Sequence, residues 1–170
     1  LSGSSAVNNL TIDNGATVSI GAGNTFTING SLSGTGTLSG SSTSNLITGA
    51  STTVYFTSGS NTLKNLTVNG GTLTLGNALN ITAGAAANTF GTVTVASGAT
   101  LASAGNLTLK SGLYGTARVA ANTSAAAYIT GEVTVERYIP QNIKRAWRML
   151  SVPTKGTQTI NAGWQEGQAA

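Results

Sequence analysis

The feature that most constrains this 170-residue chain is a short pattern in which two apolar residues flank one Thr, Ser or Tyr. Eight segments follow it: Leu10–Ile12, Val18–Ile20, Phe26–Ile28, Val54–Phe56, Leu66–Val68, Leu73–Leu75, Val93–Val95 and Leu107–Leu109. Apolar residues at i and i+2 are typical of a β-strand with one buried and one wet side. Threonine suits the wet side because it is β-branched. Residues 1–115 show no helical spacing, so the pattern predicts an all-β fold.

Glycine and asparagine separate these segments, as at Asn14-Gly15, Gly21–Gly23, Asn69–Gly71 and Gly105-Asn106. Both residues tolerate the positive φ angles that tight corners require. Two topologies are compatible with such separators. Asn-Gly between strands favours hairpins, and hence an antiparallel meander or sandwich. The alternative is a parallel β-helix, in which each coil holds two or three short strands.

The spacing of the segments favours the β-helix. Their centres lie about six to eight residues apart, so three sides give a coil of about twenty residues, within the range of solenoid repeats. A sandwich would place strands and turns every ~8–12 residues. The tripeptide Asn-Leu-Thr also recurs at Asn9, Asn65 and Asn106, where an inward Leu follows a corner Asn. We therefore predict about five coils over residues 7–115, right-handed like most parallel crossovers.

The composition narrows the chemistry available to the chain. Gly, Thr, Ser and Asn make up half of it, and it contains neither His nor Cys. A zinc site with nitrogen and sulfur ligands, a His-dependent nucleophile and a disulfide framework are therefore excluded. Only four residues are acidic, which leaves few oxygen ligands for a metal. We expect no cofactor, no metal and no enzymatic activity. The 39% apolar content argues against disorder.

Charge divides the chain into parts. Residues 1–109 carry one acid, Asp13, and one base, Lys64, whereas every other charged residue, both Trp and both Pro follow later. A shift this sharp is typical of a module boundary. We predict β-helix repeats over 1–118, an Ala-rich connection over 119–130, and a β-rich capping or connecting module over 131–170 that is cut short at residue 170.

Two charged groups suggest chemistry but have simpler explanations. Glu132 and Glu136, four residues apart on a strand, would lie about 13 Å apart. Glycosidases need ~5 Å or ~6.5–9.5 Å, so an ion pair of Glu136 with Arg137 or a neighbouring base is favoured. The basic run 144–148 surrounds Trp147 and could mimic a nucleic-acid patch. We instead expect Trp147 and Trp164 to pack the core of the C-terminal module, with no nucleic-acid partner.

Threonine pairs suggest a ligand-binding face. They occur at Thr25 and Thr27, Thr72 and Thr74, and Thr92 and Thr94, with a further pair at residues 35 and 37. An outward ladder of threonines spaced ~4.8 Å by ~7 Å could match ice or a glycan. The hypothesis requires the pairs to share one flat, uninterrupted face. Otherwise Thr is simply the outward residue of a polar strand.

An exposed aromatic row would also favour glycan binding. Tyr55, Tyr114 and Tyr128 are its candidate members. No apolar run approaches the ~20 residues needed to cross a bilayer, so we expect no membrane insertion of this segment.

The last third carries a resemblance. Three runs, Val-Thr-Val-Glu-Arg-Tyr-Ile-Pro (133–140), Lys-Arg-Ala-Trp-Arg-Met-Leu-Ser-Val-Pro (144–153) and Gln-Thr-Ile-Asn-Ala-Gly-Trp-Gln-Glu-Gly (158–167), resemble a segment of large cell-surface proteins of Bacteroidota. The match covers residues 131–167 and includes no catalytic motif. The preceding repeats resemble filamentous-haemagglutinin-like and autotransporter-like β-helix stalks in style.

The resemblance implies a function and a location. Such surface proteins are typically exported by the type IX secretion system and act as adhesins or gliding-associated filaments. For this chain it implies an extracellular, outer membrane-associated stalk. Its partners would be the rest of a longer chain, the secretion machinery and surface glycans.

Overall fold

The computed structural model describes residues 1–122 and 128–141, and every regular element in them is a β-strand. Residues Leu1–Ile139 form one compact unit. The strands are β1 (Ser5–Val7), β2 (Leu10–Thr11), β3 (Thr17–Ser19), β4 (Thr25–Ile28), β5 (Leu32–Ser33), β6 (Thr37–Ser39), β7 (Asn45–Thr48), β8 (Thr52–Val54), β9 (Thr62–Leu63), β10 (Asn65–Val68), β11 (Thr72–Leu75), β12 (Leu79–Ile81), β13 (Thr92–Val95), β14 (Thr100–Ala102), β15 (Leu107–Leu109), β16 (Ser111–Gly112), β17 (Gly115–Thr116), β18 (Arg118–Val119), β19 (Ile129–Thr130) and β20 (Val133–Val135).

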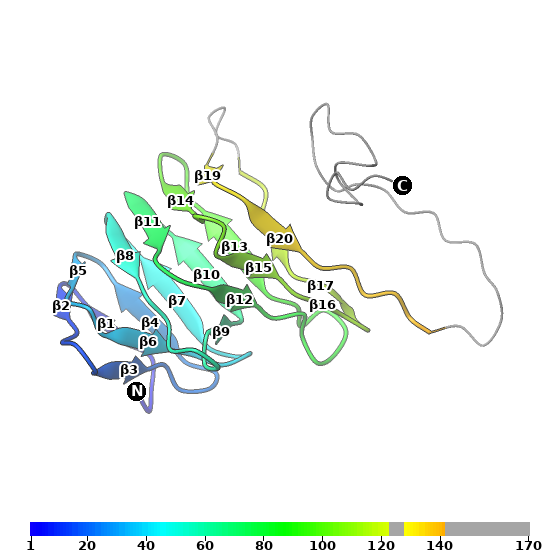
Figure 1. Ribbon diagram of the computed structural model, residues 1–170, viewed down its shortest axis with the longest axis horizontal. Coiled ribbons are helices and arrows are strands. Elements are labelled where there is room, and N and C mark those ends of the chain that lie inside the picture. The colour runs from blue at the N-terminus through cyan, green and yellow to red at the C-terminus, as the bar shows by residue number, and fades with distance from the viewer. Residues whose placement is uncertain (123–127, 142–170) are drawn as a thin grey trace, which may run out of the picture. The chain divides into compact units, whose positions relative to one another are not determined.

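The strands form parallel sheets whose members come from distant parts of the chain. The first sheet has the order β1-β4-β7-β10-β13-β18, the second β8-β11-β14-β19 and the third β9-β12-β15-β20, while β2 pairs with β5 and β3 with β6. Figure 1 shows β4, β7, β10 and β13 side by side in this order. Among the described strands only β16 and β17 pair antiparallel. The all-β, parallel prediction is confirmed, and the antiparallel meander is rejected.

Register repeats about every twenty residues over the first four strands of the first sheet. Asn45 pairs with Thr25 and with Asn65, each 20 residues away. The next interval, from Asn65 to Thr92, is 27 residues because a longer loop precedes β13. Five successive three-strand units result, β1–β3, β4–β6, β7–β9, β10–β12 and β13–β15. The predicted repeat of about twenty residues therefore holds for the early units.

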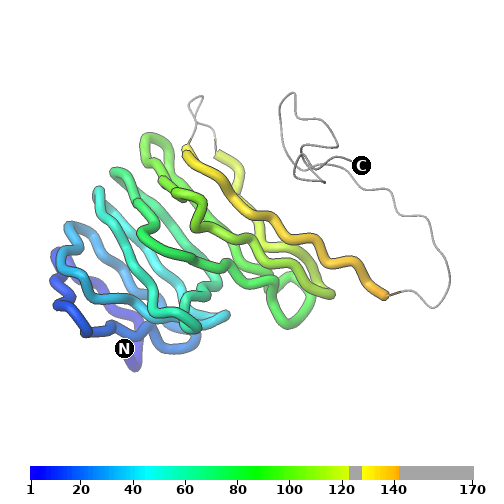
Figure 2. Tube along the Cα trace, viewed as in Figure 1, coloured from blue at the N-terminus to red at the C-terminus, as the bar shows by residue number. Residues whose placement is uncertain are grey.

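Strand pairing continues beyond residue 118, where we predicted the repeats to end. β18 pairs with β13, β19 with β14 and β20 with β15, all parallel. Figure 2 shows the segment that leads through β20, yellow to orange, alongside the green segment before it. The parallel sheets thus include Val119, Ile129 and Thr130 of the Ala-rich connection and Val133–Val135 of the predicted C-terminal module. Trp147 and Trp164 lie outside the described residues.

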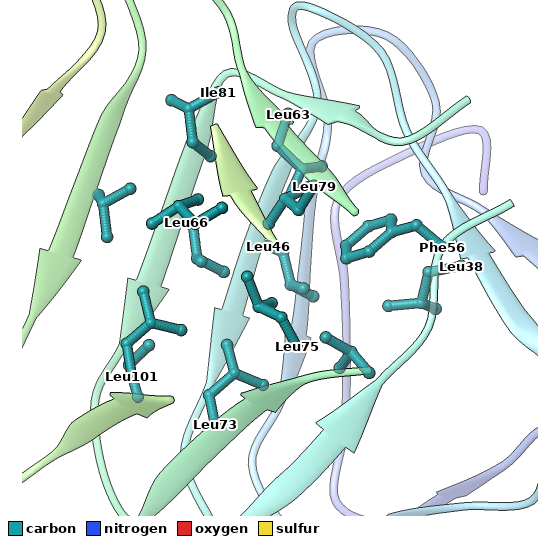
Figure 3. Close-up of a cluster of buried hydrophobic side chains, with 14 of the residues drawn as sticks. Leu38, Leu46, Phe56, Leu63, Leu66, Leu73, Leu75, Leu79, Ile81 and Leu101 are labelled. Atoms are coloured by element: carbon teal, nitrogen blue, oxygen red, sulfur yellow. The ribbon is translucent and has the colours of Figure 1, made fainter. Parts of the chain in front are cut away.

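Inward side chains stack on like side chains of the next unit. Leu66 lies between Leu46 and Val93 in register, and all three are fully buried. Figure 3 shows such side chains pointing toward one another in the space between the sheets. Because each residue sits at one strand spacing from its equivalent, close packing requires matched shapes from unit to unit. This requirement explains the repeated Leu, Val and Ile at i and i+2.

Four-residue turns form several corners. Ala16 N donates to Asp13 O at 2.9 Å, and Ala99 N donates to Ala96 O at 3.1 Å. The third residue of each turn is a glycine with positive φ, +79° at Gly15 and +81° at Gly98. A side chain would be strained in that conformation. The glycine separators of the sequence therefore mark corners, as predicted.

Asparagine side chains tie neighbouring units together. Asn9 Oδ1 accepts from Ser31 N at 2.9 Å, and Asn106 Nδ2 donates to Leu75 O at 2.9 Å. Asn65 Nδ2 donates to the side chain of Asn45 at 2.9 Å. Asn9 and Asn106 lie just before β2 and β15, and Asn65 is the first residue of β10, so these bonds satisfy backbone and amide groups where strands begin. The recurring Asn of Asn-Leu-Thr thus has a structural role at all three of its positions.

One inward position holds a polar residue. Thr48 is fully buried between Ile28 and Val68, and its Oγ1 has no hydrogen-bond partner among the described residues. We expect Thr48→Val to raise the free energy of unfolding by about 1–2 kcal/mol, because it removes a buried unpaired hydroxyl without changing shape. Urea denaturation followed by circular dichroism measures this. Thr67→Val, on the outer side of β10, is the control and should change stability by less than about 0.5 kcal/mol.

Candidate functional site: outer faces and a notch at Lys64

The six threonines of the predicted ladder lie on two sheets. Thr25 and Thr27 belong to β4 and Thr92 and Thr94 to β13, both in the first sheet, whereas residues 72 and 74 belong to β11 in the second. Within the first sheet, β7 and β10 lie between β4 and β13. The two threonines of each pair therefore lie on the same strand, but the three pairs do not share one face.

Other side chains interrupt the threonines of the first sheet. The outward row through Thr27 continues in register to Ile47, Thr67 and Thr94. The parallel row that contains residues 25 and 92 passes through two asparagines, at positions 45 and 65. Ice or glycan recognition by a threonine lattice needs an unbroken array, which these rows lack.

A short hydroxyl ladder lies on another sheet. Thr17 and Thr37 stack in register on β3 and β6, with hydroxyl oxygens 3.0 Å apart, and the hydroxyls of Thr37 and Thr57 lie 2.7 Å apart. These groups hydrogen-bond to one another and so hold adjacent units in register. The ladder does not appear as Thr-x-Thr within one strand, so the threonine pairs of the sequence did not predict it. The signal was threonine recurring every twenty residues.

The exposed aromatic residues do not form one row. Tyr55 follows β8, Tyr114 lies between β16 and β17, and Tyr128 precedes β19 and packs against the core. At the tip of the β16–β17 hairpin, Leu113 is the most exposed large apolar side chain of the described residues, at 65%, and Tyr114 beside it is 49% exposed. Gly115 in this hairpin packs near the Phe90 ring, over which the Arg118 guanidinium lies at 5.3 Å.

Corners of unequal length create a notch on the outer surface. The connections leading into β4, β7, β10 and β13 are residues 20–24, 40–44, 64 and 82–91. Lys64 is therefore the one residue between β9 and β10. The corresponding connections of the preceding and following units are longer and project farther from the surface. A pocket of about 310 Å³ results, and its lining includes Lys64, Ser42 and Thr43 on one side and Ala85, Ala86 and Thr89 on the other.

The backbone fixes Lys64 at the base of this notch. Its N donates to Ser44 O at 2.8 Å, and its O accepts from Thr92 N at 3.1 Å, so it is held by both neighbouring units. Its half-buried side chain has no hydrogen bond or ion pair within the described residues. The one carboxylate of residues 1–109, Asp13, lies in the turn between β2 and β3. No carboxylate among residues 1–122 and 128–141 therefore pairs with the positive charge of this site.

The only salt bridge among the described residues joins Lys110 to Glu136. The Glu136 carboxylate also accepts from Ser111 N at 3.2 Å. The hydrogen bond from Lys110 is the main cause that lowers the pKa of Glu136 below its usual value, aided by Ser111 N, while burial opposes it. The partner of Glu136 is thus Lys110, a base that strand pairing brings close, and not Arg137. Arg137 instead donates to Glu136 O at 3.2 Å.

Glu136→Gln tests this ion pair. Because folding lowers the Glu136 pKa, its stabilisation is present above the unfolded pKa and is lost as the pH falls through the folded one. Both side chains are more than one third exposed, so we expect a loss of about 0.2–1 kcal/mol at pH 7. Denaturation at pH 7 and pH 2.5 should show that the difference from wild type disappears in acid. A constant difference would contradict the pairing.

The acidic residues at positions 13, 132 and 136 are the only ones in ranges 1–122 and 128–141. No group of three or more acidic residues there could hold a metal ion. No helix of the described part is long and apolar enough to cross a membrane. Comparison with known proteins found no matching family model, no matching curated protein and no matching solved structure.

Proposed function

We propose that this chain is a non-enzymatic segment of a large cell-surface adhesin or filament, in which residues 1–122 and 128–135 belong to a right-handed parallel β-helix that acts as a rigid stalk. In this proposal the first, second and third sheets are the walls of each coil. The observation that carries it is the in-register parallel pairing of six strands, β1 to β18, in one sheet. Right-handedness follows the general preference of parallel crossovers.

The proposed mechanism is mechanical. Each unit pairs with the next through backbone hydrogen bonds on several sheets, so a load is shared among many bonds. The outer faces hold mostly Thr, Ser and Asn, and residues 1–109 hold only two charged side chains. Interactions along the stalk would therefore depend little on salt, because few surface charges are present to be screened.

The cellular setting rests on the resemblance of residues 131–167 to Bacteroidota surface proteins. It places the stalk outside the cell, associated with the outer membrane, after export by the type IX machinery. The rest of the longer chain would carry the binding modules. The glycan- or ice-binding alternative is less well supported, since its threonines divide between two sheets.

A deletion in register tests the stalk function. Thr25 and Asn45 occupy equivalent positions, so deleting residues 25–44 removes one unit and lets Asn45 take the place of Thr25. Cells that carry the parent protein with this deletion should attach to their target as wild-type cells do. Deleting residues 25–34, half a unit, should abolish attachment because it puts Gly36 in the place of the buried Phe26 and corner residues 40–44 in the place of β5.

Surface labelling is the control for both deletions, because a missing protein would also abolish attachment. If the protein that lacks residues 25–44 reaches the surface but the cells no longer attach, the deleted unit binds the target itself. The stalk proposal then fails. If cells without the parent protein attach normally, the adhesion proposal fails.

A further inference from the structure

The notch at Lys64 has the character of a small-ligand site. Its volume of about 310 Å³ is at the lower end of the range for small-molecule pockets. It arises from the one-residue corner between longer corners, so its shape is set by the fold rather than by mobile side chains. It borders the first sheet, because Lys64 O accepts from Thr92 N, but none of the six ladder threonines lines it.

Its chemistry combines one cation, hydroxyls and methyl groups. Lys64 supplies a charge without a partner among the described residues, and the Ser42 hydroxyl is exposed and likewise unpartnered there. Thr43 Oγ1 accepts from Gly23 N at 3.1 Å and lies 3.2 Å from Ser41 Oγ, so it can donate to a ligand when Ser41 is the donor of that second bond. The Ala85 and Ala86 methyl groups line the remaining wall.

We propose that this notch binds an acidic monosaccharide unit of a polysaccharide. The ligand carboxylate would pair with the Lys64 ammonium, its hydroxyls would bond to Ser42 and Thr43, and its C–H face would pack on Ala85 and Ala86. A free phosphate or sulfate fits less well, because such ions need several donors or cations around them. The proposal does not depend on the threonine ladder or on the stalk function.

Titration of the full chain with trigalacturonate tests the proposal. The fully methyl-esterified trisaccharide has the same skeleton without charge, and it should bind at least about tenfold more weakly. Lys64→Gln should weaken trigalacturonate binding by a similar factor, because it removes the charge and leaves the backbone bonds of residue 64 intact. Arg137→Gln changes the net charge equally and should leave binding within about twofold. Ala86→Phe, which fills the exposed wall, should also abolish binding.

Three outcomes would overturn the proposal. The first is equal weakening by Lys64→Gln and Arg137→Gln, which would indicate general charge attraction. The second is complete competition by inorganic phosphate at the same concentration as the sugar, which would indicate a simple anion site. The third is the absence of trigalacturonate binding by a wild-type chain with an all-β circular dichroism spectrum. None of these results bears on the deletion in register, which measures attachment by cells.

Discussion

Gly34→Ala is expected to lower the free energy of unfolding by about 2–4 kcal/mol. Gly34 has a φ of +88°, which costs an L-residue about 1–2 kcal/mol. An added Cβ would also lie 2.1 Å from the backbone oxygen of Ile12 in the preceding unit. That oxygen accepts from Gly36 N at 2.9 Å, so it cannot move without loss of a hydrogen bond between units. Overpacking of this kind adds roughly 1–3 kcal/mol.

Gly23→Ala separates the two causes. Gly23 has a similar φ of +76°, but an added Cβ would meet no atom within 4 Å. Only the backbone strain remains in this variant, and the lower entropy of its unfolded chain offsets part of that strain. The free energy of unfolding should therefore fall by less than about 1 kcal/mol. Urea denaturation of both variants measures the difference. Equal losses would show that neighbouring units are not in contact at Gly34.

Leu66→Ala should produce the second large effect, a decrease of about 3–5 kcal/mol in the free energy of unfolding. Leu66 is fully buried, and its register partners Leu46 and Val93 lie on either side. Parallel strands hold these partners at one strand spacing, so the neighbours cannot collapse into the cavity. Among buried leucines, those at rigid sites of this kind lose the most stability on substitution by alanine.

Thr67→Ala is the matched control, because residue 67 lies on the same strand with its side chain on the outer face. Its loss should be less than about 1 kcal/mol. Thermal or urea denaturation followed by circular dichroism compares the two. A loss at Leu66 no larger than at Thr67 would mean that the alternation of inward and outward residues is incorrect.

The sequence was sufficient to predict the strands whose alternation is regular. All eight predicted segments overlap strands or strand bridges of the structure, from β2 to β15. β7 was missed because its sequence, Asn-Leu-Ile-Thr, breaks the alternation. Ile47 faces outward and Thr48 inward there, since pairing with β4 and β10 fixes the register whatever the polarity. At β7 the local polarity pattern and the pairing with neighbouring strands favour different faces for these side chains. The pairing determines which face they take.

The site was harder to predict than the fold. Period two identifies outward residues, but it does not say which sheet they face, so the threonine pairs could not be assigned to one surface. The notch depends on the relative lengths of four corners, and Lys64 was visible in the sequence only as an isolated base. The partner of Glu136, Lys110, is 26 residues away, and only the pairing of β20 with β15 brings them together.

The central claim, stacked parallel units, is tested most directly by distances between spin labels. The chain has no cysteine, so Ala6→Cys with Thr94→Cys, and Thr27→Cys with Thr94→Cys, each place two labels on one outward row. Four and three strand spacings separate these pairs, which predicts about 19 Å and about 14 Å. Electron paramagnetic resonance should give a difference of about 5 Å, the first pair being longer. Equal distances, or a longer distance for Thr27 and Thr94, would contradict the account.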